Sequence, residues 1–178
     1  SIRANLSANQ SYGNVAGCLS ANLDTTDSDI VINSSADRFT GNGNGCVFIA
    51  GLRQGVEAVF DNSLTVTASA STFRSNTGAL PAVFPMPGGI IAIGGQNVDS
   101  VNPSSDNKLA IDLLAVTMGD NHGTDITGFG TSSAGTLTAG TDNAVVLRRL
   151  ATRASNNTIV DSVPNDPTDT NTIDVFPY

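Results

Sequence analysis

The sequence predicts an all-β fold, a right-handed parallel β-helix (solenoid) of about five coils with long loops between its strands. Three observations predict it: a composition poor in charge and rich in glycine, a block of residues that recurs along the chain, and alternation of apolar residues inside each block. Only 13% of the 178 residues are charged, and the 18 glycines suit short strands joined by turns. We expect one domain over residues 1–178, because this length supports a single sizeable core.

The recurring block aligns without gaps in four segments, and residues 1–14 match it with the first two positions missing. The coils therefore begin near residues 1, 27, 61, 106 and 142. The complete blocks read DSDIVINSSADRFTGN (27–42), DNSLTVTASASTFRSN (61–76), DNKLAIDLLAVTMGDN (106–121) and DNAVVLRRLATRASNN (142–157).

Three columns of the aligned blocks predict the interior. Two apolar residues spaced by two open each block, as in a strand with one buried face. A constant Ala predicts a tight inward corner that admits only a methyl group, and the residue three positions later predicts a second short strand that fills the core. The pairs are Ile2/Ala4, Ile30/Ile32, Leu64/Val66, Leu109/Ile111 and Val145/Leu147; the alanines are Ala8, Ala36, Ala70, Ala115 and Ala151; the core column reads Ser11, Phe39, Phe73, Met118 and Ala154.

Asparagine closes every block. This residue tolerates the left-handed or bridge conformations of turns, and its amide can hydrogen bond to the Asn of the next coil. Such rows stabilise stacked strands that are in register. The sequence therefore predicts a structural ladder of Asn14, Asn42, Asn76, Asn121 and Asn157.

Aspartate opens every complete block, as Asp27, Asp61, Asp106 and Asp142. On adjacent parallel strands these carboxylates would lie about 4.8 Å apart, where a bridging Ca²⁺ would relieve their repulsion. The alternative is that each Asp accepts backbone N–H bonds in an Asx turn before its strand. The glycine-rich pattern of RTX calcium loops is absent from the sequence. We therefore expect either no cofactor or Ca²⁺ on this column.

A third strand is predicted after each closing Asn. It reads GCLSANL, GCVFIAGL, GGIIAIGG and TDITGFG in the first four coils, and TIDVF (172–176) in the last. The main insertions are residues 77–88, whose three prolines exclude a central strand, and residues 161–171. Residues 144–154 would form a helix capped by Asp142 if they were read alone. Because this segment keeps both Asp and Asn in frame, the repeat favours a strand.

The two cysteines, Cys18 and Cys46, each follow a Gly, four residues after a closing Asn. Equivalent places in adjacent coils put their Cα atoms about 5 Å apart, within the range of a disulfide. A Cys18–Cys46 disulfide and two stacked buried thiols are the alternatives.

Two further clusters carry ionisable side chains. The only His, His122, lies between Asp120 and Asp125, where a general base or metal site is the alternative to a solvated turn. Arg148, Arg149 and Arg153 form a local basic patch. These arginines would pair with Asp112, an outward neighbour of Arg148, or with acidic residues of another chain.

Charge and hydropathy exclude several partners. The formal net charge of −8 repels phosphate backbones and anionic lipid headgroups, so we expect neither nucleic-acid binding nor membrane-surface binding. No apolar run approaches the ~18 residues of a membrane span, so we expect no membrane insertion. The composition favours an extracellular or cell-surface location.

The repeat resembles the pectate-lyase-like right-handed parallel β-helix superfamily. The segments STFRSNTG…GGIIAIGG and LAVTMGDNHGTDITGFG are similar to repeats of bacterial surface and autotransporter-type passenger proteins. This resemblance covers nearly the whole chain and implies a β-helix, but it implies no single function. The superfamily includes polysaccharide lyases and hydrolases, tailspikes, adhesins and inert stalks.

Two functions follow as expectations. The first is a non-catalytic extracellular structural or adhesive protein that binds other copies of itself or belongs to a longer surface protein, because the first strand begins without a cap and leaves a coil edge open. The second is a carbohydrate-active enzyme or glycan-binding module. The absence of Trp, the presence of only two Tyr, and the lack of an acid pair on one face count against the second. An enzyme is therefore not the favoured expectation, and no catalytic residue is assigned.

Overall fold

The computed structural model describes residues 1–14, 19–43, 45–53, 59–76, 89–97, 104–121, 125–133, 140–154, 157–160 and 170–177, and the structural statements below concern these residues. They form strands and turns, with no helix among them, and their strands pair in parallel. The predicted all-β class is therefore confirmed. Within the described ranges no helix is long and apolar enough to cross a membrane.

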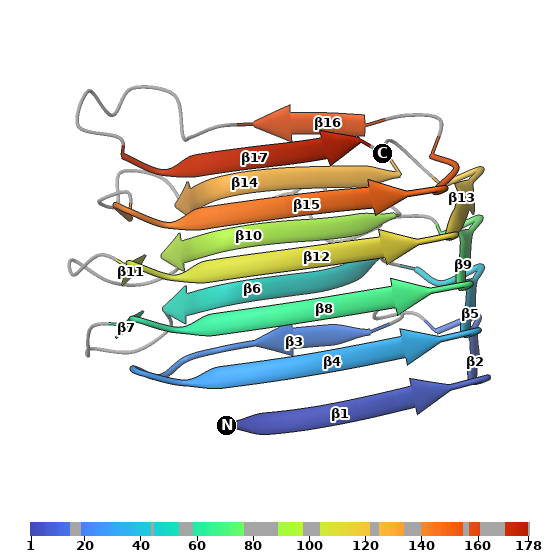
Figure 1. The fold of residues 1–178 in the computed structure, drawn as a ribbon, viewed down its shortest axis with the longest axis horizontal. Coiled ribbons are helices and arrows are strands. Elements are labelled where there is room, and N and C mark those ends of the chain that lie inside the picture. Colours follow the sequence, from blue (N-terminus) through green and yellow to red (C-terminus); the bar gives the residue numbers. More distant parts are fainter. Residues whose placement is uncertain are drawn as a thin grey trace.

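The strands form three main sheets (Figure 1). The six-stranded sheet contains, in spatial order, β1 (Ile2–Ser7), β4 (Asp29–Ser35), β8 (Ser63–Ser69), β12 (Lys108–Leu114), β15 (Ala144–Leu150) and β17 (Thr172–Pro177). The five-stranded sheet behind it contains β16 (Asn157–Val160), β14 (Ile126–Ser133), β10 (Ile90–Asn97), β6 (Cys46–Arg53) and β3 (Ser20–Asn22). A four-stranded sheet of β13 (Thr117–Gly119), β9 (Thr72–Arg74), β5 (Arg38–Thr40) and β2 (Gln10–Tyr12) stands where the strands of the first sheet end. A short pair, β7 (Val59–Phe60) and β11 (Ser104–Ser105), lies at the opposite end.

The chain visits these sheets in a constant order. Each repeat adds one strand to the six-stranded sheet, one to the four-stranded sheet and one to the five-stranded sheet. In the fifth repeat a bridge between Thr117 and Arg153 takes the place of the middle strand. We use "repeat" for one such passage of the chain.

The last strand corrects the sequence interpretation. The segment TIDVF belongs to β17, which pairs with β15 in the six-stranded sheet and so begins a sixth repeat. The third strand of the fifth repeat is β16, which pairs with β14. TIDVF has the same apolar alternation as the first strand of every block, so its place in the first column follows from its own pattern.

The registers of the six-stranded sheet reproduce the predicted apolar columns. Ile2 pairs with Ile30, and Leu109 pairs with Leu64 on one side and with Val145 on the other. The helical alternative for residues 144–154 is wrong, because Ala144–Leu150 form β15. In-register stacking buries one apolar column over another, and complete burial of one such side chain contributes about 1.5–3 kcal/mol.

The main core lies between the sheets. Inward residues of the six-stranded sheet, such as Leu64 and Ile111, meet Phe48 and Ile90 of the five-stranded sheet. The predicted core column fills one end of this interior, with Phe39, Phe73 and Met118 buried. The rings of Phe39 and Phe73 are stacked, with centroids 4.9 Å apart.

The alanine corner differs from the prediction. Ala8, Ala36, Ala70, Ala115 and Ala151 all have positive φ, between 48° and 55°, and their side chains are exposed rather than directed inward. The backbone turns at these residues in a left-handed conformation, and the N–H of Ala36, for example, donates to the Ser69 carbonyl of the next repeat. In the second, third and fourth repeats the residue after the Ala faces the interior instead, as buried Asp37, Ser71 and Val116 show.

The long insertion at residues 77–88 and most of the one at residues 161–171 lie outside the described residues.

Candidate functional site

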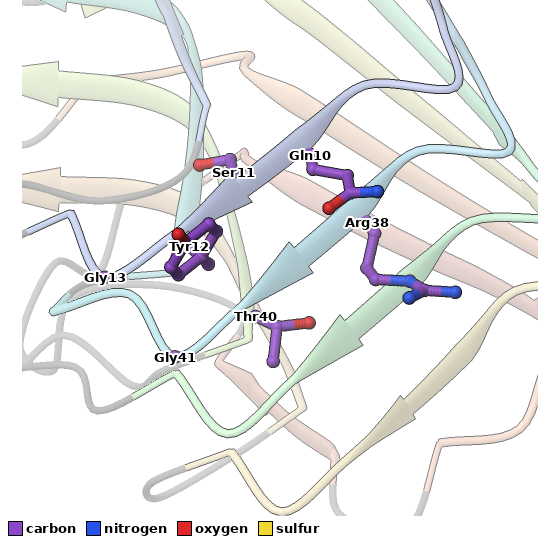
Figure 2. Close-up of a pocket in the computed structure, with 7 residues that line it drawn as sticks. All are labelled: Gln10, Ser11, Tyr12, Gly13, Arg38, Thr40 and Gly41. Carbon is purple, nitrogen blue, oxygen red and sulfur yellow. The ribbon is translucent and has the colours of Figure 1, made fainter.

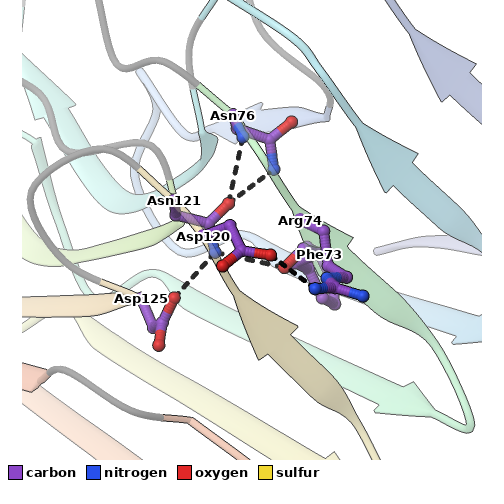
Figure 3. Close-up of polar contacts among 6 residues, drawn as sticks. All are labelled: Phe73, Arg74, Asn76, Asp120, Asn121 and Asp125. Atoms are coloured by element: carbon purple, nitrogen blue, oxygen red, sulfur yellow. Dashed lines mark hydrogen bonds and ion pairs between the residues drawn. The ribbon is translucent and has the colours of Figure 1, made fainter.

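The predicted asparagines at the end of the middle strand form a hydrogen-bonded row. Asn14 Nδ2 donates to Asn42 Oδ1 at 3.1 Å, and Asn42 Nδ2 donates to Asn76 Oδ1 at 3.0 Å. Asn76 Nδ2 continues the row to Asn121 Oδ1 at 3.0 Å (Figure 3). The backbone N–H groups of the first three asparagines donate to the same oxygens. Each amide oxygen therefore joins two repeats.

A left-handed residue precedes each member of this row, as Gly13, Gly41, Ser75 and Asp120, with φ between 55° and 67°. This corner turns the following amide inward. Asn157, the fifth predicted member, has another place: it begins β16, with its Cα opposite Ile126 rather than opposite Asn121. The register of the fifth repeat therefore departs from the ungapped alignment after Arg153.

A second row of asparagines lies at the start of the six-stranded sheet. Asn62 Nδ2 donates to Asn107 Oδ1 at 2.9 Å, Asn107 Nδ2 to Asn143 Oδ1 at 2.9 Å, and Asn143 Nδ2 to Asn171 Oδ1 at 3.0 Å. Asn62, Asn107 and Asn143 are at most 1% exposed. This row was not among the predicted sites, although an Asp-Asn pair opens three of the four complete blocks.

Two glycines of the five-stranded sheet make room for the second row. A Cβ atom on Gly51 would lie 2.3 Å from Asn107 Nδ2, and one on Gly95 would lie 2.6 Å from Asn143 Nδ2. These distances are far below van der Waals contact, so a side chain at either position would displace the amide. Gly51 of the segment GCVFIAGL and Gly95 of the segment GGIIAIGG therefore have a packing role beside the amide row.

The predicted Asp column is at the corner that precedes the second row. Asp27, Asp61, Asp106 and Asp142 have φ between 53° and 56°, and all four are exposed. Short polar residues such as Asp adopt this left-handed conformation more readily than most others. Among the described residues no group of three or more His, Cys, Asp or Glu side chains is placed to hold a metal ion.

A third polar cluster lies at the alanine corner. Asn9 Nδ2 donates to Asp37 Oδ1 at 3.1 Å, Ser34 Oγ donates to Asp37 Oδ2 at 2.7 Å, and the Asp37 N–H donates to Ser71 Oγ at 3.1 Å. Asp37 is only 1% exposed, so the Asn9 and Ser34 donors replace the water that its carboxyl group loses on burial. The residue equivalent to Asp37 is Ser71 in the third repeat and Val116 in the fourth, where the polar cluster ends.

Cys46 is disulfide-bonded and fully buried. Cys18, the partner that the sequence analysis considers, lies outside the described residues.

The segment around His122 has structural contacts at both ends. Asp120 forms an ion pair with Arg74 of the neighbouring repeat, and buried Asp125 accepts a hydrogen bond from Asn121 Nδ2 at 2.8 Å (Figure 3). His122 itself lies outside the described residues.

The three arginines predicted as one patch lie on different faces. Arg148 is exposed and donates through Nε to Asp112 Oδ1 at 2.5 Å and through its terminal NH₂ group to Oδ2 at 3.2 Å, which confirms the predicted pairing. Arg149 lies in register with Leu113, whose side chain is buried, and the Nε of Arg149 has no hydrogen-bond partner among the described residues. Arg153 follows the next corner, in the bridge to Thr117.

One open hollow lies on the outer side of β2 and β5. It has a volume of about 380 Å³ and is lined by Gln10, Ser11, Tyr12, Gly13, Arg38, Thr40 and Gly41 (Figure 2). Tyr12 is 77% exposed, and within the described part of the chain no carboxylate forms an ion pair with Arg38. An exposed ring beside a guanidinium, an amide and a hydroxyl can contact a polar ring compound such as a sugar.

Within the described residues, the buried asparagines thus form hydrogen bonds between repeats and hold the repeats in register. The hollow on β2 and β5 is a separate surface feature that is open to ligands. No protein family, curated protein or solved structure matches this chain.

Proposed function

We propose that the chain is a right-handed parallel β-helix of the pectate-lyase-like kind and acts as a non-catalytic extracellular structural or adhesive protein. The single observation that carries the proposal is the pair of hydrogen-bonded asparagine rows, most of whose members are buried. A row such as Asn62–Asn107–Asn143–Asn171 uses its amides to join repeats, which leaves them unable to act on a substrate. Rows of this kind give stiffness to stacked strands, as a structural protein requires.

Two further observations support the proposed location and partners. A disulfide at Cys46 suits an oxidising compartment outside the cytosol. The proposed partners are other copies of the chain or the rest of a longer surface protein, which would cover the open edges of stacked strands. The net charge of −8 disfavours nucleic acid and anionic membranes as partners.

Negative-stain electron microscopy of the purified protein, with a size measurement in solution, tests this function. Defined oligomers or filaments are the expected result. A protein that stays monomeric at every concentration, or one that depolymerises acidic polysaccharides with or without Ca²⁺, contradicts it. Calorimetric titration with Ca²⁺ tests the Asp27, Asp61, Asp106 and Asp142 column separately, and heat of binding that disappears in Asp61→Asn would show a calcium site there.

A carbohydrate-binding role is the second candidate, and the hollow beside Tyr12 is the observation that favours it. A sugar ring would lie against the Tyr12 face while Gln10, Arg38 and Thr40 bind its hydroxyl or carboxylate groups. A glycan array with the wild-type protein tests this role, with Tyr12→Ala and Arg38→Ala as the variants. Binding that these substitutions abolish supports it, and an array without signal excludes the tested glycans.

A further inference from the structure

An apolar patch interrupts the polar outer surface of the six-stranded sheet. Leu114, Leu150 and Phe176 are 44%, 51% and 44% exposed, and they lie on the neighbouring strands β12, β15 and β17. Leu114 pairs directly with Leu150, and Phe176 pairs with Arg148, two residues before Leu150. We call these three residues the apolar patch. Large exposed side chains gathered on adjacent strands mark an interaction surface more often than isolated ones.

The fold itself does not require apolar residues at these positions. The column that contains Leu114 and Leu150 has Ser35 and Ser69 on β4 and β8. The column of Phe176 has Asn33 on β4. The same outward positions are thus polar at one end of the sheet and apolar at the other.

A pair of opposite charges adjoins the patch, two residues before Leu114 and Leu150 on the same strands. Asp112 and Arg148 are side by side on β12 and β15, with exposed side-chain fractions of 33% and 45%, and they bond to one another. Such a pair is its own electrostatic complement when it is turned by 180° about an axis that runs between β12 and β15, parallel to these strands. A two-fold interface has this property, because residue i meets residue j and residue j meets residue i.

We propose that the apolar patch is the contact between two copies of this chain related by a two-fold axis. A two-fold axis that runs between β12 and β15, parallel to these strands, places Leu114 of each copy against Leu150 of the other. It also places Asp112 of each copy against Arg148 of the other. Phe176 then lies opposite Thr67 of the other copy and borders the contact. The inference deepens the proposed structural function, on which it rests, because it names the partner and the face through which it binds. An anionic lipid surface fits less well, since the Asp112 carboxylate lies beside the patch and the whole chain has a charge of −8.

Sedimentation analysis of Leu114→Ser and Leu150→Ser tests the apolar part. Both residues are exposed, so the fold should persist, and unchanged circular dichroism would verify this. We expect the dissociation constant of the dimer to rise about tenfold or more in each variant, as for residues at the centre of an interface. Val31→Ser is the matched control, because Val31 faces the same side on β4, outside the patch, and should leave the constant unchanged.

A charge exchange tests the two-fold geometry. The double variant Asp112→Arg/Arg148→Asp keeps an ion pair inside each chain and remains complementary to itself, so it should still form homodimers. In a heterodimer with the wild type, Asp would face Asp and Arg would face Arg, and such like-charge contacts select against the mixed species. Native mass spectrometry of an equal mixture should therefore show heterodimers well below their statistical share.

The outcomes separate the inference from the function on which it rests. Assemblies that the serine variants leave unchanged, or heterodimers at the statistical share, overturn the two-fold contact and leave a structural function through other faces standing. A wild-type chain that is monomeric up to about 1 mM overturns both.

Discussion

Truncation of one buried asparagine, Asn107→Ala, should remove much of the stability that the second row supplies. The Asn107 side chain donates to Asn143 Oδ1 at 2.9 Å and to Ser104 Oγ at 3.0 Å. Its Oδ1 accepts from Asn62 Nδ2 at 2.9 Å and from the Asn62 backbone N–H at 3.2 Å. At about 1 kcal/mol for each hydrogen bond, the four bonds contribute about 4 kcal/mol to the free energy of unfolding.

The partners of Asn107 are not affected equally. Asn62 Nδ2 keeps its bond to the Thr25 carbonyl at 2.7 Å, and Asn143 Oδ1 keeps the Asn107 backbone N–H at 3.2 Å. The Asn62 N–H loses the acceptor that the structure gives it and stays buried. An unsatisfied buried N–H costs about 1–3 kcal/mol. The decrease in the free energy of unfolding therefore exceeds about 4 kcal/mol unless the backbone moves so that the Asn62 N–H reaches another acceptor or water.

Urea unfolding measures the total loss, and hydrogen exchange measures the local one. In Asn107→Ala the Asn62 amide should exchange faster relative to global unfolding, while the Lys108 amide, which donates to the Asn62 carbonyl at 2.8 Å, should not. Asn33→Ala is the matched control: Asn33 bonds to Asn5 in an exposed pair, and its loss should cost about 0.5 kcal/mol or less. A loss below about 1 kcal/mol with a protected Asn62 amide would refute the reasoning.

Three further changes test the packing around the rows. Gly95→Ala places a Cβ 2.6 Å from the amide nitrogen of Asn143 and should cost about 1–3 kcal/mol in urea unfolding, whereas Gly119→Ala, with no atom within 4 Å, should cost far less. Phe73→Ala removes one ring of the buried stack and should lower the free energy of unfolding by about 3–5 kcal/mol; a loss under 1 kcal/mol would mean that the core does not depend on this column. Reduction of the disulfide at Cys46 should cost about 2–5 kcal/mol, and a thiol assay on the unreduced, denatured protein should find no free thiol.

Much of the architecture could be predicted because the repeat aligns residues that occupy equivalent places in space. The apolar alternation of Leu64, Leu109 and Val145 gave the register of the six-stranded sheet correctly, since a shift by one residue would expose every buried side chain. The Arg148–Asp112 pair followed from the same register.

The corners were harder to predict, because a sequence column does not say which of two neighbouring residues points inward. At the alanine corners the left-handed residue is exposed, and in the second to fourth repeats the next one, such as Asp37, is buried. In the same way, exposed Asp106 precedes buried Asn107. The prediction considered the charged residue of each Asp-Asn pair as the candidate site and did not consider the buried amide beside it. The proposed contact through Leu114 and Leu150 was not predicted, because the alternation places these leucines on the outer face but does not say what covers that face.

The polar cluster at Asp37 has a consequence for how the chain finds its register while it folds. Both amide rows present the same group in successive repeats, so a chain displaced by one whole repeat would still satisfy most of the asparagines. At the alanine corner the neighbours are all different: Asn9 donates to Asp37, Asp37 donates to Ser71, and Val116 ends the series with an apolar side chain. A displaced chain would bury the Asp37 carboxylate against Val116, which costs several kcal/mol. Because its residues differ from one repeat to the next, this corner stabilises the native register over registers displaced by a whole repeat.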